Sequence, residues 1–157
     1  MTVDAPREAA QRKADTLDKL TAPAADIWVA SASVSATGVA HPYLVPLSLG
    51  WVDERIVLAL EADSRTACNI AVTGNARLAL GPTRDVVIID AVLDAKHPVT
   101  EAPSGIGDAY AAQSHWDPRT AGDGYVYLLL RPERIQAWRE ANELPGRTLM
   151  RAGRWLV

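Results

Sequence analysis

Short apolar runs separated by turn residues fill the first half of the chain. Such runs lie at residues 27–34 (IWVASASV), 42–49 (PYLVPLSL) and 55–61 (RIVLALE). A Thr-Gly turn at residues 37–38 follows the first run, and residues 50–54 form a short turn before the third. Connections this short permit antiparallel hairpins, because a parallel pairing needs a much longer crossover. The pattern therefore predicts three consecutive antiparallel strands.

The second half of the chain alternates between strand-like and helix-like segments. Four further strands are predicted at residues 76–80, 85–93, 124–130 and 133–139, the last two on either side of Pro132. Three helices are predicted at residues 6–20, 63–75 and 104–116, the second with Asp63 or Ser64 as its N-cap. Many short strands with tight turns are typical of an antiparallel barrel or sandwich. The sequence thus predicts a mainly β fold, a β-barrel with peripheral helices.

Two predicted strands are apolar almost without interruption. They are RIVLALE at residues 55–61 and DVVIID at residues 85–90. One face of an antiparallel sheet can meet water, so continuous apolar runs indicate strands that are covered on both faces. Two small helices cannot cover that much sheet, whereas a second subunit packed against the barrel wall would do so. We therefore predict a homodimer; the alternative is that one of these runs is a buried helix.

The length of 157 residues suits one domain over residues 1–157, with an N-terminal helix within residues 1–22 and a C-terminal tail at residues 140–157. The formal net charge of -3 provides no strong positive field for nucleic acid or an anionic membrane. Cys68 is the sole cysteine, which fits a reducing compartment. The charged N-terminal stretch lacks the apolar core of a signal peptide, and no apolar run approaches the roughly 20 residues that span a bilayer. A cytoplasmic protein is predicted.

The segment EADSRTACNI at residues 61–70 is a candidate phosphate site. A strand ends here and a Ser-Arg-Thr triplet opens a helix. The free N–H groups and the dipole at a helix start attract anions. The hydroxyls of Ser64 and Thr66 can donate hydrogen bonds, and Arg65 can bind two phosphate oxygens at once. The alternative is an ordinary N-cap beside a solvated arginine.

The segment GVAHPYLVPLSL at residues 38–49 is a candidate ring site. Pro42 and Pro46 interrupt an otherwise strand-like run. Proline lacks a backbone donor, so this strand is expected at the edge of the sheet. An irregular edge leaves neighbouring N–H and C=O groups free to bind the polar edge of a planar heterocycle. The alternative is an edge strand that prolines protect from aggregation.

The order of these motifs resembles a known family. The run G-x-x-H-P-Y-L-V-P-L-S-L, a hairpin, S-R-T-A-C-N-I and then A-R-L-A-L-G is similar to the pyridoxamine 5'-phosphate oxidase-like split barrels. The resemblance covers roughly residues 25–95, with a looser match through residue 139. It implies an antiparallel Greek-key split barrel that forms a homodimer with cofactor sites at the subunit interface. Members bind FMN or the deazaflavin coenzyme F420, and some bind haem or no known cofactor.

The resemblance also assigns residues to the cofactor. The strand at residues 43–47 would lie beside the tricyclic ring, residues 64–66 would hold the phosphate, and Asn69 matches a common family position. Many relatives carry a lysine where this chain has Thr66, so this site has one positive charge fewer, which favours FMN with its single phosphate over coenzyme F420. The predicted cofactor-binding residues are His41, Tyr43, Leu44, Val45, Pro46, Leu47, Ser64, Arg65, Thr66, Asn69 and Arg84.

Some side chains have two interpretations. Arg84, on a turn, could reach the cofactor phosphate or an anionic substrate, or remain solvated. Trp116 and Trp138 could line a substrate pocket or pack in the barrel core. The tail at residues 145–157 carries arginines at helical spacing, which indicates either a basic lid or, as we favour, a solvated face beside a docked apolar set. The arginines are Arg147, Arg151 and Arg154, and the apolar set is Leu149, Trp155 and Leu156.

No metal site or nucleophile is predicted. His41, His97 and His115 are far apart, and none has a second ligand at metal-site spacing. His41 adjoins the ring site and could donate to the cofactor. Cys68 has no neighbouring histidine or aspartate and is expected to be a small core residue.

The predicted function follows from the cofactor. Hydride chemistry would belong to the flavin or deazaflavin, so the chain would position it and needs no catalytic side chain. The prediction is an FMN- or coenzyme F420-dependent oxidoreductase that acts on a small flat organic substrate. One alternative is a non-catalytic flavin, deazaflavin or haem carrier. Another is a degenerate split-barrel dimer without a cofactor.

Overall fold

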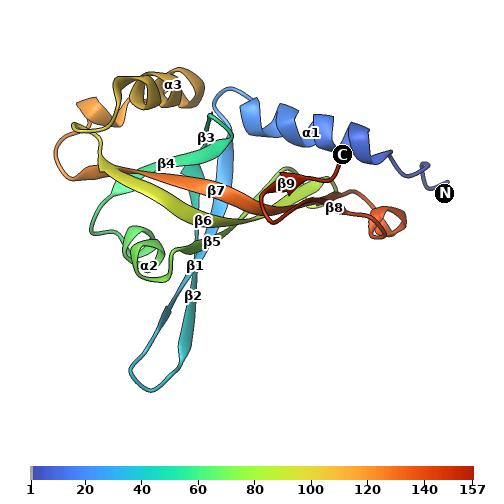
Figure 1. The fold of residues 1–157 in the computed structure, drawn as a ribbon, viewed down its shortest axis with the longest axis horizontal. Coiled ribbons are helices and arrows are strands. Elements are labelled where there is room, and N and C mark those ends of the chain that lie inside the picture. Colours follow the sequence, from blue (N-terminus) through green and yellow to red (C-terminus); the bar gives the residue numbers. More distant parts are fainter. Residues whose placement is uncertain (1) are drawn as a thin grey trace.

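The computed structural model describes residues 2–157, so Met1 lies outside the described residues, and these residues form one antiparallel sheet of nine strands (Figure 1). The strands are β1 (Asp26–Val34), β2 (Ala40–Ser48), β3 (Gly50–Val52), β4 (Arg55–Glu61), β5 (Asn75–Leu80), β6 (Val86–Pro98), β7 (Tyr125–Trp138), β8 (Thr148–Arg151) and β9 (Arg154–Trp155). Their order is β2-β1-β5-β6-β7-β4-β3, and β8 pairs with β7 and β9. The helices are α1 (Ala9–Thr21), α2 (Arg65–Thr73) and α3 (Ser104–Ser114), with short 3-10 helices η1 (Pro118–Thr120) and η2 (Ala141–Glu143). The predicted mainly β, antiparallel architecture is confirmed.

The two strands predicted at residues 124–130 and 133–139 are one strand, β7, which continues through Pro132. Its pairing with β6 shifts register there, because Asp90 is opposite Arg134 while Ala91 is opposite Pro132. The extra residue, Glu133, forms a β-bulge that lets the strand accommodate a proline without a backbone donor. The prediction of a break at Pro132 was therefore wrong.

Two further segments predicted as turn or tail contain strands. β3 falls within the turn expected at residues 50–54, and its Trp51 pairs with Ile56 of β4. The C-terminal tail folds into the β8–β9 hairpin, so its arginines are not on a helix and the predicted helical spacing is wrong. The expected docking holds in part: Leu149 is buried and Trp155 packs against the core, whereas Leu156 is exposed.

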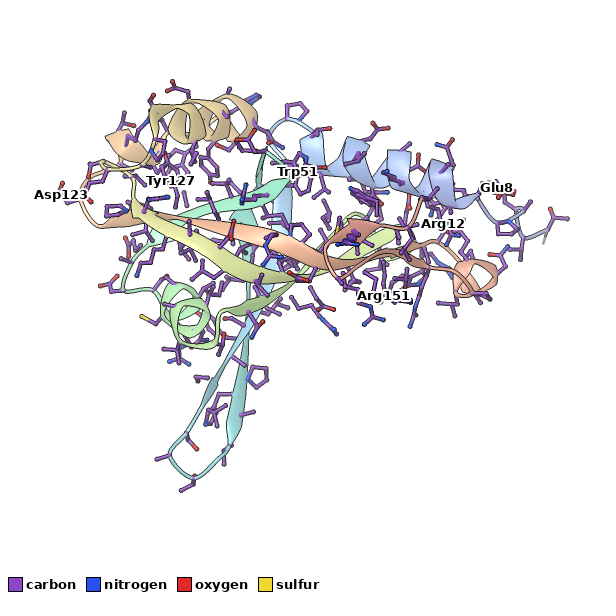
Figure 2. All side chains as sticks on the ribbon, in the orientation of Figure 1. Glu8, Arg12, Trp51, Asp123, Tyr127 and Arg151 are labelled. Atoms are coloured by element: carbon purple, nitrogen blue, oxygen red, sulfur yellow. The ribbon has the colours of Figure 1, made fainter. Side chains whose placement is uncertain are left out.

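Strand β4 is buried on both faces because two apolar clusters lie on either side of the sheet. Ile56, Leu58 and Leu60 belong to the main core inside the barrel. Val57 and Ala59 belong to a second cluster that lies under α3 and contains Tyr110 and Tyr127, and Figure 2 shows Tyr127 between α3 and the sheet. The same chain therefore covers the run that we expected a second subunit to cover, and that reason for a dimer was wrong. In β6, burial simply alternates, with Val87 and Ile89 fully buried.

The β1–β2 hairpin extends beyond the rest of the sheet (Figure 1). The last residue of β1 that pairs with β5 is Ala30, which is opposite Arg77 on one side and Leu44 on the other, so residues 31–43 project as an arm with Leu44 at its base. The arm and its base carry exposed apolar side chains at Val34, Val39 and Leu44. Exposed apolar side chains thus gather on one projecting hairpin.

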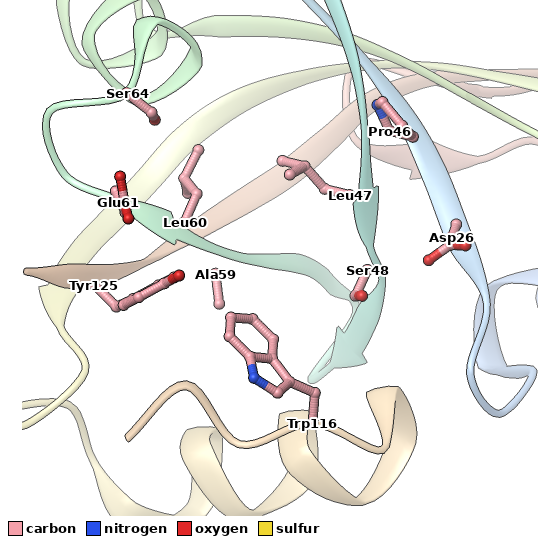
Figure 3. A pocket seen from close by; sticks show the side chains of 10 residues that line it. All are labelled: Asp26, Pro46, Leu47, Ser48, Ala59, Leu60, Glu61, Ser64, Trp116 and Tyr125. Carbon is pink, nitrogen blue, oxygen red and sulfur yellow. The ribbon is translucent and has the colours of Figure 1, made fainter. Parts of the chain in front are cut away.

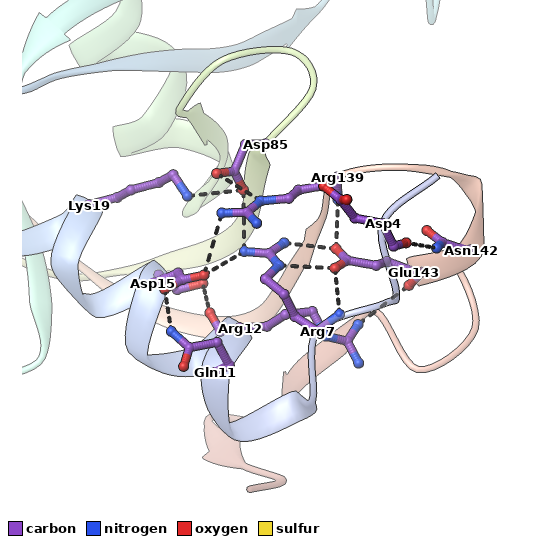
Figure 4. Close-up of polar contacts among 11 residues, drawn as sticks. Asp4, Arg7, Gln11, Arg12, Asp15, Lys19, Asp85, Arg139, Asn142 and Glu143 are labelled. Atoms are coloured by element: carbon purple, nitrogen blue, oxygen red, sulfur yellow. Dashed lines mark hydrogen bonds and ion pairs between the residues drawn. The ribbon is translucent and has the colours of Figure 1, made fainter. Parts of the chain in front are cut away.

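An ionic cluster fastens the N-terminal segment to η2 (Figure 4). Arg7 donates hydrogen bonds to both carboxylate oxygens of Glu143 at 2.8 and 2.9 Å and pairs with Asp15 at 2.7 Å. Asp85 extends the cluster through Lys19, with an Nζ–Oδ1 distance of 3.2 Å. The Arg7 and Glu143 side chains are almost fully buried, and Arg7 is the ion-pair partner of the Glu143 carboxylate, so the charge of Glu143 depends on Arg7. No helix within residues 2–157 has the length and apolar character that crossing a membrane requires.

Candidate functional site

A cavity of about 430 Å³ opens between the start of α2, the inner end of β2 and the segment after α3 (Figure 3). Leu47, Ala59 and Leu60 supply apolar lining. Trp116 and Tyr125 contribute aromatic rings that meet edge to face, with their centroids 5.5 Å apart. The remaining lining residues are Asp26, Pro46, Ser48, Glu61 and Ser64. An apolar cavity with a few convergent polar groups is the usual form of a small-molecule site.

Ser64 borders this cavity and is the N-cap of α2, as the sequence predicts. Its Oγ accepts a hydrogen bond from the backbone N–H of Ala67 at 3.2 Å. A serine hydroxyl that accepts one hydrogen bond still has its own hydrogen to donate. Gly74 ends the helix in the left-handed conformation, with φ at 72°. The cavity therefore receives the positive end of a well-capped helix.

The other predicted residues of α2 have structural positions. Thr66 and Asn69 are buried against the barrel. Asn69 donates from Nδ2 to the Oγ of Ser31 at 3.2 Å, which holds α2 against β1. Cys68 is exposed, so its predicted core position was wrong. Within the Ser-Arg-Thr triplet, only Ser64 lines the cavity.

Arg65 and Tyr43 meet at the base of the arm. The Cζ atom of Arg65 lies 5.2 Å from the centroid of the Tyr43 ring, a cation–π contact. This contact joins the two segments that the sequence assigns to phosphate and ring binding. The guanidinium lies next to the start of α2 and outside the lining of the cavity.

Strand β2 is the edge strand that its prolines predict, because it ends the sheet order and pairs with β1 alone. Pro46 and Leu47 line the cavity, and the side chains of Val45 and Leu47 pack against the core. His41 lies further out on the exposed arm, and Leu44 is exposed at its base. An edge strand leaves alternate backbone N–H and C=O groups without a strand partner.

Two predicted site residues lie elsewhere in the chain. Arg84 is largely exposed and pairs with Glu140 at 3.5 Å. Trp138 lies at the far end of β7 from Tyr125 and stacks under Arg147, whose Cζ is 5.0 Å from its ring centroid. Neither lines the cavity within one chain, so of the two candidate tryptophans Trp116 lines it and Trp138 does not.

Six lining residues were not among the predicted site residues, namely Asp26, Ser48, Ala59, Leu60, Glu61 and Tyr125. Glu61 and Tyr125 stand at the ends of β4 and β7 and face each other in the register of these strands. Asp26 begins β1 and is paired in register with Ser48. Position at a strand end was the available signal, but it does not reveal which strand ends meet.

Deeper in the molecule, burial raises the pKa of Tyr110 to about 12, which keeps this phenol neutral.

These residues fit a flat ring with a short anionic tail. The ring would lie against the free edge of β2 near Pro46 and Leu47, and the tail would point to Ser64 and Arg65. Arg65 is the one basic side chain in residues 63–69, which suits a single phosphate better than a longer anionic tail. Within residues 2–157, no group of three or more histidine, cysteine, aspartate or glutamate residues could hold a metal ion.

No family model matches the chain, and no curated protein matches it. Solved structures do match. An F420 reductase is 12% identical with a TM-score of 0.58, over 75% of this chain and 94% of that one. A heme-binding protein from Mycobacterium smegmatis is 15% identical with a TM-score of 0.60, over 96% of this chain and 60% of that one. A putative pyridoxamine 5'-phosphate oxidase from Listeria innocua is 11% identical with a TM-score of 0.57, over 82% of this chain and 98% of that one.

At these identities the likeness shows the fold. The chain is an antiparallel split barrel. More particularly, it has the split-barrel fold of the pyridoxamine 5'-phosphate oxidase-like proteins, as its motif order indicates.

Proposed function

We propose that this protein binds FMN, with coenzyme F420 as the alternative, and is an oxidoreductase for a small flat organic substrate. The observation that carries the proposal is that the two segments predicted to bind the ring and the phosphate line the same cavity. The edge strand at Pro46 and Leu47 and the helix N-cap at Ser64 border one cavity. The F420 reductase and the putative pyridoxamine 5'-phosphate oxidase with this fold support it.

Hydride transfer would be the chemistry that a bound flavin supplies. The chain's own groups would bind and orient it. Ser64 and Arg65 would hold the phosphate. Backbone N–H groups at the free edge of β2 would stabilise negative charge on the polar edge of the ring, and Pro46 contributes none. Trp116 and Tyr125 would exclude water from the reacting face.

A homodimer in the cytoplasm is part of this proposal. The exposed apolar side chains of the arm and its base, with Leu44 at 59% and Val34 at 66% exposure, support a partner surface on the hairpin that also carries the ring-binding strand. A second copy is the occupant that we propose, because two-fold pairing is the commonest form of assembly. The single cysteine fits the reducing cytoplasm.

A second candidate is a carrier that holds a flavin, a deazaflavin or haem without turnover. The heme-binding protein with the same fold favours it. A third is a dimer with no cofactor. The absorption spectrum of the protein, purified and then mixed with each cofactor, separates these: flavin, deazaflavin or haem bands support a binding protein, and a colourless protein that takes up none supports the third. Turnover with reduced cofactor then separates the enzyme from the carrier.

The decisive test is a titration of FMN into wild type and into the double variant Ser64→Ala, Arg65→Ala. We expect the variant to lose FMN binding while keeping its fold, measured by circular dichroism. Arg84→Ala is the matched control, because it removes an arginine that does not line the cavity. Equal FMN affinity in wild type and the double variant would overturn the phosphate site.

A further inference from the structure

The charged side chains that line the cavity are all negative. Asp26 and Glu61 line it, and its lining contains no lysine, arginine or histidine. In Figure 3 Glu61 lies on the side of Tyr125 and Asp26 on the side of Ser48, with Trp116 between them. Two carboxylates on opposite sides of one cavity make the potential there more negative, while the start of α2 at Ser64 adds a positive contribution on one side.

The two carboxylates are not neutralised by neighbours. Among the described residues, 2–157, neither Asp26 nor Glu61 forms an ion pair or a side-chain hydrogen bond. Other acidic residues of the fold are paired: Asp94 with Arg55 and Asp90 with Arg77, both at 2.6 Å. Both side chains are exposed to solvent, so these unpaired carboxylates are hydrated and free to contact a ligand that enters the cavity.

The aromatic rings add a second attraction of the same sign. Trp116 and Tyr125 are half-buried, and both line the cavity. Their edge-to-face contact leaves ring surface directed at the cavity. The face of an indole or phenol ring attracts a cation within about 6 Å of its centroid. Aromatic faces combined with carboxylates are the groups that bind organic cations.

We propose that the cavity selects a flat organic cation, such as a protonated aromatic amine or an N-alkylated heterocycle, over neutral and anionic molecules of the same shape. Calling this cation the substrate rests on the proposed function. The anionic tail of the cofactor would bind at Ser64, which lines the cavity at the start of α2, and at Arg65, which lies outside the lining beside Tyr43. The two charges of the site are thus separated, with the basic group at the base of the arm and the acidic groups around the cavity.

The test uses three soluble probes that share a pyridine ring. They are 1-methylnicotinamide, which is a cation, nicotinamide, which is neutral, and nicotinate, which is an anion. Isothermal titration calorimetry of the purified protein at neutral pH should show the cation binding roughly tenfold more tightly than the neutral probe. Nicotinate should bind most weakly. The preference should shrink as salt is added, because ionic screening weakens charge attraction.

Variants decide whether the carboxylates cause the preference. Asp26→Asn combined with Glu61→Gln should bring cation and neutral affinities together. Glu101→Gln is the matched control, because Glu101 is exposed and does not line the cavity, and it should retain the preference. Equal affinities for all probes in the wild type, no cation binding at millimolar concentration, or an unchanged preference in the double variant would overturn the inference.

A parallel FMN titration separates this inference from the proposed function. FMN binding without a cation preference overturns the inference alone. A cation preference that the double variant loses, in a protein that takes up neither FMN nor coenzyme F420, overturns the proposed function and leaves a cation site. If the protein shows neither FMN binding nor a cation preference, the proposed function and this inference are both overturned.

Discussion

The guanidinium of Arg65 lies over the ring of Tyr43, with 5.2 Å between Cζ and the ring centroid. This contact links the first residue of α2 to a residue of β2, 22 positions earlier in the chain. A stacked guanidinium loses part of its rotational freedom before any ligand arrives. In the proposed anion site, Tyr43 would therefore act by positioning Arg65.

Removing the ring should weaken cofactor binding without unfolding the protein. We expect Tyr43→Ala to lower FMN affinity about two- to fivefold, the equivalent of roughly 0.5 to 1 kcal/mol for an exposed cation–π contact. Tyr43→Phe should bind like the wild type, because it keeps the ring. Quenching of FMN fluorescence measures both. Equal losses in the two variants would assign the effect to the hydroxyl and contradict the stacking argument.

Ser64 has a structural role and a proposed binding role, which two substitutions separate. Ser64→Ala removes the N-cap and should cost about 1 kcal/mol of unfolding free energy, measured by urea denaturation. Ser64→Asp keeps a side-chain oxygen for the N–H of Ala67 and should retain most of the stability. Its negative charge should nevertheless repel phosphate and lower FMN affinity more than Ser64→Ala does. An Asp variant that binds FMN as the wild type does would refute the anion site.

The local features of this site were predictable from sequence. The N-cap at Ser64 depends on a residue and its next few neighbours, and the edge position of β2 follows from prolines that cannot donate. These signals lie within a few residues of the structure that they predict, so no tertiary information is needed.

Features that depend on tertiary placement were not predictable. Strand β4 is covered by α3, which begins more than 40 residues later, so its apolar run carried no information on what covers it. The continuity of β7 depends on a bulge opposite β6. The cavity brings Asp26 beside Ser48 and Glu61 beside Tyr125 through strand pairing. Asp26 belongs to no sequence motif, and Glu61 opens the EADSRTACNI segment without a predicted role of its own.

Acid should break the buried ion pair between Arg7 and Glu143. Hydrogen bonds from Arg7 lower the pKa of Glu143 from 4.5 to about 2. Because the folded-state pKa is depressed, this pair contributes stability above pH 4.5, and the contribution is lost as the pH falls towards 2. Glu143→Gln should therefore lower the unfolding free energy by about 2 kcal/mol at neutral pH and flatten its pH dependence between these values.

Urea denaturation at several pH values measures this effect. Glu140→Gln is the matched control, because Glu140 is half-exposed and its partner Arg84 is mostly exposed. Exposed pairs contribute little, so this control should change stability by less than about 0.5 kcal/mol. Parallel pH curves for the wild type and Glu143→Gln would show that the buried pair is not responsible for acid sensitivity.

The arm provides the last prediction, which concerns assembly. Leu44 is 59% exposed on the hairpin that we propose as the partner surface. Leu44→Glu would place a charge inside an apolar interface, so it should convert the dimer to a monomer while leaving the barrel folded. Native mass spectrometry and sedimentation measure the change. Leu156→Glu is the control, because Leu156 is 55% exposed just after β9, which pairs with β8 and not with β1 or β2, and it should leave the dimer intact. A wild-type monomer, or a Leu44→Glu variant that remains dimeric, would remove the arm from the interface.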